Sequence, residues 1–96
     1  MIEVRQTDEF ESWFESLRDR EARFRILARI RRLSLGNPGD VEPVGEGVSE
    51  LRIPYGPGYR IYIRKQGDAT IVLLAGGDKS SQKSDIERAK ELARGL

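Results

Sequence analysis

The sequence predicts a small α+β domain: an antiparallel-rich sheet, in the order β-α-α-β-β-β-α, backed by a helical hairpin and followed by a short C-terminal helix. Three observations carry this prediction. Two alternating runs flank a Gly/Pro turn in residues 51–64, apolar residues recur at helical spacing in residues 10–33, and residues 70–75 are continuously apolar. Without internal repeats or a linker, residues 1–96 are expected to form one domain.

The chain is expected to begin with a short strand and a helix. Ile2 and Val4 alternate with charged residues, and this strand should join an edge of the sheet or pair in parallel. Thr7 and Asp8 offer an N-cap, and Asp8 with Glu11 resembles a capping box. The helical face that follows carries Phe10, Trp13, Phe14 and Leu17. Large rings at this spacing are typical of a core.

A second helix is expected from about residue 21 to residue 35, with Gly36 positioned to end it. Its apolar stripe comprises Ala22, Ile26, Ile30 and Leu33. Five arginines lie mostly off this stripe: Arg23, Arg25, Arg29, Arg31 and Arg32. This face is either an ordinary solvated helix face or a surface that follows phosphates, and the sequence leaves both interpretations open.

Residues 41–47 are expected to form a loop before the hairpin of residues 51–64. Residues two apart in a strand share a face, so the apolar residues of the hairpin gather on one side. The other side carries Arg52, Arg60, Tyr62 and Arg64, and no acidic residue lies between positions 51 and 66. That side is either a solvated sheet face or a phosphate-binding surface, since arginine recognises phosphate through two parallel hydrogen bonds.

The last strand is expected at residues 70–75, covered on both faces. Gly76 and Gly77 then form either a plain strand exit or a loop whose backbone can approach a ligand. Ser84 with Glu87 predicts a capping box for a helix that ends near Ala93.

Composition restricts the chemistry. The net charge of +1 hides basic blocks at residues 17–36 and 51–66. The chain lacks cysteine, a transmembrane run and the layout of a signal peptide, so we expect a cytoplasmic protein without membrane contact. It also lacks histidine, and no carboxylate spacing resembles a calcium loop, so neither a metal site nor a cofactor is expected.

The remaining candidates suit a phosphodiester substrate. Arginines can stabilise the negative charge that develops on a phosphate, and Lys79 or Tyr62 could transfer protons if its pKa moves toward 7. RNA supplies its own nucleophile, the 2′-hydroxyl group. The residues therefore permit RNA cleavage but do not require it.

Four segments, in this order, resemble the RelE/ParE toxin superfamily, and within it the HigB-like group called addiction-module killer proteins: residues 35–40, 45–52, 55–62 and 76–82. The resemblance covers nearly the whole chain. It implies a toxin that is neutralised by a cognate antitoxin, commonly encoded beside it. In the RNA-cleaving members, the toxin enters the ribosomal A site and cuts mRNA through the 2′-hydroxyl without a metal, which inhibits translation.

The resemblance also implies roles for individual residues. Arg60 matches the phosphate-binding arginine of the family, Lys79 lies where the family places a basic active-site residue, and Arg52 matches a basic strand position. Together with the residue chemistry, this makes Arg60, Lys79 and Tyr62 the candidate catalytic residues of an endoribonuclease. Arg52 and Arg64 are the candidate substrate-binding residues.

Two features differ from the RelE nuclease and keep other interpretations open. No aromatic residue follows Tyr62, and Glu42, Glu46 and Glu50 stand where that nuclease is rich in lysine. One alternative is a ParE-like protein that inhibits DNA gyrase and cleaves nothing. Another is a degenerate member that only binds an antitoxin-like partner.

Overall fold

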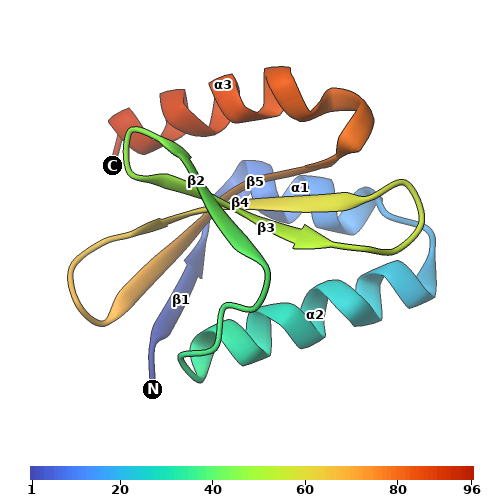
Figure 1. Cartoon of the computed structure of the whole chain (residues 1–96), viewed down its shortest axis with the longest axis horizontal. Coiled ribbons are helices and arrows are strands. Elements are labelled where there is room, and N and C mark those ends of the chain that lie inside the picture. Colours follow the sequence, from blue (N-terminus) through green and yellow to red (C-terminus); the bar gives the residue numbers. More distant parts are fainter.

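One five-stranded sheet forms the centre of the fold in the computed structural model, which describes residues 1–96 (Figure 1). In spatial order its strands are β1 (Glu3–Gln6), β5 (Thr70–Asp78), β4 (Tyr59–Lys65), β3 (Val48–Ile53) and β2 (Val41–Gly45). β1 lies at an edge and runs parallel to β5, and every other neighbouring pair is antiparallel. These features confirm the predicted α+β class and the predicted place of the first strand.

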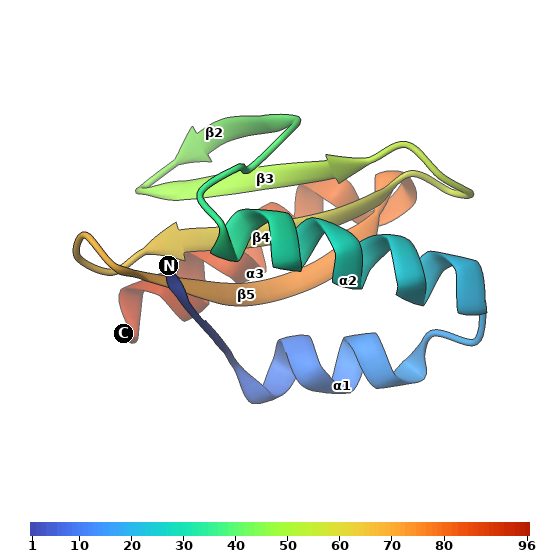
Figure 2. The ribbon, with the colours of Figure 1, turned by 90° about the horizontal axis from the view of Figure 1, so that it is seen from below.

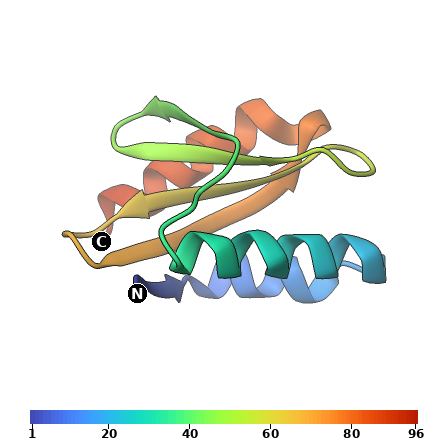
Figure 3. The same cartoon turned by 60° about the horizontal axis from the view of Figure 1, so that its bottom comes forward.

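Helices cover both faces of this sheet (Figures 2 and 3). The predicted helical hairpin, α1 (Asp8–Ser16) and α2 (Arg20–Ser34), packs on one face. The C-terminal helix α3 (Gln82–Arg94) follows a short 3₁₀ helix, η1 (Lys79–Ser81), and packs on the opposite face. None of the helices combines the length and apolarity needed to cross a membrane.

The two core layers follow from the alternation of side chains along the strands. Between the sheet and the α1–α2 hairpin lie Phe10, Ile26, Leu33, Leu51, Ile53, Ile61, Ile63, Ile71 and Leu73. Between the sheet and α3 lie Val48, Tyr62, Val72, Leu74, Ala75, Ala89 and Ala93. The apolar side of the β3–β4 hairpin therefore builds a core as predicted, whereas its other side is partly covered by α3.

Local sequence signals set the ends of the first two helices. The Thr7 hydroxyl accepts the backbone N–H of Phe10 at 3.0 Å, so Thr7 is the N-cap of α1. Gly36 ends α2 with a φ of 89°, and the N–H groups of Gly36 and Asn37 donate to the carbonyls of Leu33 and Arg32. This is a Schellman motif, which needs a left-handed residue at the position of Gly36.

The predicted capping box of α3 is wrong. The helix begins at Gln82, two residues before Ser84, and the Ser84 hydroxyl donates to the carbonyl of Ser81. Asp78 accepts the N–H of Ser80 at 2.8 Å and starts η1, so the chain is already helical when it reaches Ser84.

The expected loop at residues 41–47 is also wrong, because β2 occupies most of it. β2 pairs antiparallel with β3, and Pro43 lies on this edge strand, where a missing N–H costs little. The turn that joins them places Gly45, Glu46 and Gly47 at positive φ. The run Val-Glu-Pro-Val-Gly has no clear alternation, so its pattern gave no strand signal.

Gly76 and Gly77 belong to β5 rather than to a loop that approaches a ligand. A Cβ atom at Gly76 would overlap the ring of Trp13 on one face of the sheet. A Cβ atom at Gly77 would overlap the carboxylate of Asp85 on the other face. The two glycines therefore let α1 and α3 approach the end of β5 closely.

Candidate functional site

Three of the predicted cationic residues line one groove beside the tip of the β3–β4 hairpin. The groove has a volume of about 360 Å³ and is lined by Arg52, Arg60, Lys79, Asp40 and the turn at residues 53–58. It lies where β3 extends beyond its pairing with β2, which reaches only as far as Leu51. We call it the Arg60 groove.

The strand register brings these cations together. Arg52 lies directly opposite Arg60 across the β3–β4 pair, and Arg60 lies opposite Gly77 of β5. Lys79 follows the end of β5, and its backbone N–H donates to the carbonyl of Pro57 in the hairpin turn at 3.4 Å. The end of β5 is thereby held against the hairpin tip, which places Lys79 beside Gly58.

Arg60 and Lys79 carry positive charges that no carboxylate pairs. The ion pairs of the structure involve Arg5, Arg25, Arg52, Arg88 and Arg94. Arg60 is half-buried, and its Nε is inaccessible to solvent without a hydrogen-bond partner. Buried polar groups without partners are rare, so the Nε of Arg60 is an unsatisfied donor inside the fold, and the groove offers an anion the charge of Arg60 rather than this atom.

Arg52 lies in the same groove, but two carboxylates already bind it. Its Nε donates to Glu50 at 3.2 Å, and its terminal nitrogen forms an ion pair with Glu42. The hydrogen bond to Glu50 and the charge of Glu42 raise the pKa of Arg52 above its ordinary value. Its charge is consequently less available to a phosphate than the charge of Arg60.

Glu50 is the centre of a buried polar network under α3. Its carboxylate accepts hydrogen bonds from Gln82 Nε2 at 2.8 Å, the Tyr62 hydroxyl at 3.0 Å and Arg52 Nε at 3.2 Å. Burial alone would raise the pKa of Glu50, but these three donors and the nearby charge of Arg60 hold it below its ordinary value. The carboxylate is therefore ionised, and it links β3, β4 and α3.

Tyr62, a predicted catalytic residue, lies in the core instead of the groove. Its side chain is fully buried and donates its hydroxyl proton to Glu50. Burial, followed by this hydrogen bond, raises the pKa of Tyr62 far above its ordinary value. The phenol remains protonated at neutral pH and is covered by α3.

Arg64, a predicted substrate-binding residue, lies at the other end of β4 and does not line the groove. Its Nη1 donates to the backbone carbonyl of Ala93 at 3.0 Å, a carbonyl near the end of α3 that also accepts the N–H of Leu96. The sequence predicted the correct face of β4 for Arg64. On that face, however, the side chain binds the C-terminal end of α3 and not a substrate site.

The arginine-rich face of α2 is divided between structural and exposed side chains. Arg29 is buried and donates to the backbone carbonyls of Arg52, Pro38 and Asp40, which joins α2 to β3 and the preceding turn. Arg23 similarly donates to the carbonyls of Phe14 and Leu17. Arg25 pairs with Glu21, and of the exposed Arg31 and Arg32, which form no ion pair, only Arg32 lines a groove, so this face is not a uniform phosphate-binding surface.

The pattern of the sequence did not identify two further residues of the groove. Asp40 lines it from the turn before β2, a segment where no function was expected. Tyr55 packs against the core under the α1–α2 hairpin, as its apolar side of the strand predicts, and it also lines the groove and donates its hydroxyl to Asp19 at 2.9 Å. Its place next to the Gly-Pro-Gly turn was the only signal that the ring could lie near the tip.

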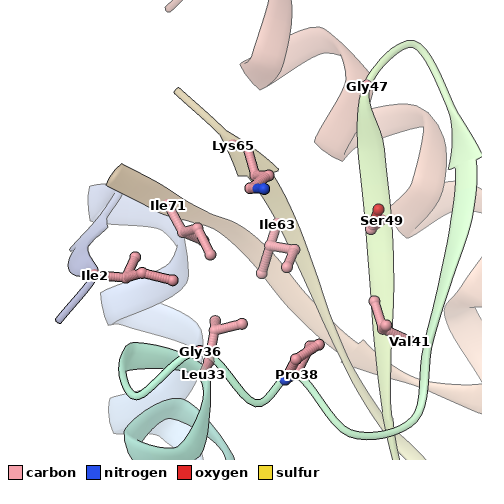
Figure 4. A pocket seen from close by; sticks show the side chains of 10 residues that line it. All are labelled: Ile2, Leu33, Gly36, Pro38, Val41, Gly47, Ser49, Ile63, Lys65 and Ile71. Carbon is pink, nitrogen blue, oxygen red and sulfur yellow. The ribbon is translucent and has the colours of Figure 1, made fainter. Parts of the chain in front are cut away.

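A separate hollow of about 420 Å³ lies on the α1–α2 face, where the end of α2 leaves the sheet uncovered (Figure 4). Its wall is mainly apolar: Ile2, Leu33, Val41, Ile63 and Ile71. Lys65 is its only charged residue. The hollow therefore lacks the cluster of cations that distinguishes the Arg60 groove.

Comparison with known proteins identifies a relative without assigning a function. No protein-family model matches the chain. A protein of Haemophilus influenzae described as an uncharacterized protein is 46% identical over 95 residues, which cover 99% of this chain and 96% of the relative. The chain therefore belongs to the same family as this Haemophilus influenzae protein.

Proposed function

We propose that this protein is the toxin of a type II toxin–antitoxin module, similar to the HigB-like branch of the RelE/ParE superfamily. It would act in the cytoplasm as an mRNA interferase that cleaves mRNA on the ribosome without a metal. The single observation that supports this proposal most is the groove that brings the unpaired cations Arg60 and Lys79 together beside a hairpin tip. A phosphodiester with its two flanking nucleosides suits such a site.

The proposed reaction uses the nucleophile of the RNA itself. The 2′-hydroxyl oxygen attacks phosphorus and loses its proton to Asp40, the only carboxylate that lines the groove. Arg60 stabilises the charge that develops on the phosphoryl oxygens. The bond from phosphorus to the 5′ oxygen breaks, and Lys79 donates a proton to this leaving oxygen. The products are a 2′,3′-cyclic phosphate and a 5′-hydroxyl end.

The proposed partner is a cognate antitoxin that presents acidic side chains to the Arg60 groove. Complementary charge steers association and disfavours wrong partners. Because Arg60 and Lys79 have no carboxylate partners of their own, an acidic segment could pair them and exclude RNA at the same time.

The test adds purified protein to a translating extract and maps the 5′ ends of the mRNA. We expect new ends with a cyclic phosphate on the upstream fragment, unchanged by EDTA. Arg60→Ala should abolish cleavage, whereas Arg31→Ala, at an exposed arginine that does not line the groove, should retain it. Cleavage by a folded Arg60→Ala protein, or cleavage that requires a metal, would contradict the proposal.

A ParE-like gyrase inhibitor is the second candidate, and two observations favour it. Arg52 is bound by Glu42 and Glu50, and Tyr62 is buried, so the groove holds fewer free catalytic groups than the sequence suggested. Intact mRNA together with stalled gyrase–DNA complexes in treated cells would favour this candidate over the nuclease.

A further inference from the structure

A second groove lies on the other side of the same sheet edge. It runs between α2 and the turn before β2, has a volume of about 550 Å³, and we call it the α2 groove. Its wall includes Phe24, Arg25, Ala28, Arg29, Arg32 and Gly39. Three residues line both this groove and the Arg60 groove: Asp40, Ile53 and Pro54. The two grooves therefore adjoin at the part of β3 that β2 leaves unpaired.

Each groove has an arginine that forms no ion pair with a carboxylate and whose Nε atom has no hydrogen-bond partner. Arg29 is only 8% exposed, and its guanidinium donates to backbone carbonyls but pairs with no carboxylate. The only buried side-chain polar atoms without a hydrogen-bond partner in the molecule are Arg29 Nε and Arg60 Nε. A buried cation that forms no ion pair raises the potential above it, although the nearby charge of Asp40 offsets part of this, and an anion at the surface of the α2 groove is favoured.

The exposed residues of the α2 groove suit a nucleotide. Glu21 forms an ion pair with Arg25 at 2.9 Å, which leaves Arg32 as the free exposed cation of the groove. Phe24 is 68% exposed, although large apolar side chains are normally covered. An exposed aromatic ring can stack on a base while an arginine about two helical turns further along α2 binds a phosphate of the same strand.

We propose that the α2 groove binds the nucleotides next to those held in the Arg60 groove, so that single-stranded RNA crosses the sheet edge at Ile53 and Pro54. Phe24 stacks on a base, and Arg32 binds a phosphate. This inference rests on the proposed function, because it extends the site of the same substrate. It makes RNA binding depend on length: a short oligonucleotide fills one groove and a longer one fills both.

The experiment measures binding of fluorescent 2′-O-methyl oligoribonucleotides by anisotropy, with strands of three and nine nucleotides at several salt concentrations. These strands lack the 2′-hydroxyl and are not cleaved. We expect Phe24→Ala to weaken binding of the long strand about fivefold or more, as the loss of one base stack predicts. Arg32→Ala should lower the salt dependence of the long strand by roughly one phosphate contact, a slope change of about 0.7. Neither variant should affect the short strand.

Two neighbouring residues provide matched controls. Leu27 is exposed on α2 like Phe24, and Arg31 is exposed like Arg32, but neither lines the α2 groove. Leu27→Ala and Arg31→Ala should therefore bind both strands as the natural protein does. All four side chains are exposed, so their removal leaves the core intact.

The outcomes separate this inference from the proposed function. If Arg60→Ala weakens both strands but Phe24→Ala and Arg32→Ala change neither, the α2 groove is not a subsite and the Arg60 groove stands. If Leu27→Ala weakens binding of the long strand as much as Phe24→Ala does, and Arg31→Ala as much as Arg32→Ala does, the effect belongs to the whole helix surface and the inference is wrong. If Phe24→Ala loses binding to a protein partner while its RNA binding is unchanged, the inference is likewise wrong, because the ligand of the α2 groove is then a protein and not RNA. Absence of any oligonucleotide binding overturns the inference, while the translating extract still decides the proposed function.

Discussion

At the scale of single residues, Glu50 determines how the cations of the site are arranged. Its buried carboxylate accepts hydrogen bonds from three donors, on β3, β4 and α3. Oε2 accepts from Gln82 and Tyr62, and Oε1 accepts from Arg52, so loss of the charge would weaken all three bonds and loss of one oxygen would leave at least one donor without a partner. Because Arg52 is among the three, the same network engages the charge of Arg52 although its side chain lines the Arg60 groove.

We predict that Glu50→Gln lowers the free energy of unfolding by about 1–3 kcal/mol, because the new amide places a donor against other donors. Urea unfolding monitored by circular dichroism measures this loss. The control is Glu42→Gln, at an exposed position, which should leave the midpoint nearly unchanged. Equal midpoints for the two variants would show that the network does not stabilise the fold.

The same network predicts the direction of a pH dependence. The pKa of Glu50 is lower in the folded protein than in the unfolded chain, so folding favours the ionised carboxylate. Its contribution is complete above the unfolded pKa of about 4.3 and is lost as the pH falls through the folded pKa. Glu50→Gln should therefore make the urea midpoint less sensitive to acid below about pH 4.3 than that of the natural protein.

The candidate residues also show what a sequence can predict about a site. Alternation correctly placed Arg52, Arg60, Tyr62 and Arg64 on one face of the hairpin. It could not show that α3 covers Tyr62 and that the end of α3 binds Arg64, because these contacts join residues about thirty positions apart. Arg60 and Lys79 share a groove as expected because the order of the strands fixes both positions.

At the scale of elements, the end of β5 is shaped by the helices on its two sides. Gly76 meets Trp13 of α1, and Gly77 meets Asp85 of α3. The sequence predicted each of these helices but gave no sign that they approach the strand so closely. A Gly-Gly pair after an apolar run resembles a turn, and only packing distinguishes it from a strand. The sequence did not predict β2 for a related reason. Its residues show no alternation of apolar and polar side chains, and the strand forms through its pairing with β3.

We predict that Gly76→Ala destabilises the protein by about 1–3 kcal/mol, as expected when an added carbon overfills a packed site. Thermal or urea unfolding gives the value. Gly95→Ala is the matched control, because a Cβ atom there meets no neighbour closer than 3.6 Å. If Trp13 causes the clash, Gly76→Ala should cost much less in a Trp13→Ala background. Additive losses in the double variant would contradict this explanation.

At the scale of the whole molecule, the two outer edges of the sheet are protected in different ways. β1 is only four residues long and carries Glu3 and Arg5. β2 carries Pro43, which cannot donate to an added strand. This protection matters because the net charge is only +1, so electrostatic repulsion between copies is weak.

We predict that Pro43→Val promotes self-association through β2 without unfolding the monomer. Light scattering over a range of concentrations measures it, and circular dichroism checks the fold. Pro43→Lys is the control, since a lysine on an edge strand restores protection by charge. A Pro43→Val protein that stays monomeric at every concentration would show that Pro43 does not guard this edge.

Trp13 has a consequence for studying the protein in solution. It is the only tryptophan, it packs against the end of β5, and its ring meets Tyr59, the first residue of β4, edge-on at 6.3 Å. Tyr59 directly follows the turn whose residues line the Arg60 groove. The tryptophan fluorescence of the protein therefore comes from one indole near the tip of the β3–β4 hairpin. Movement of the hairpin on ligand binding would change that emission, so binding can be followed optically without attaching a dye.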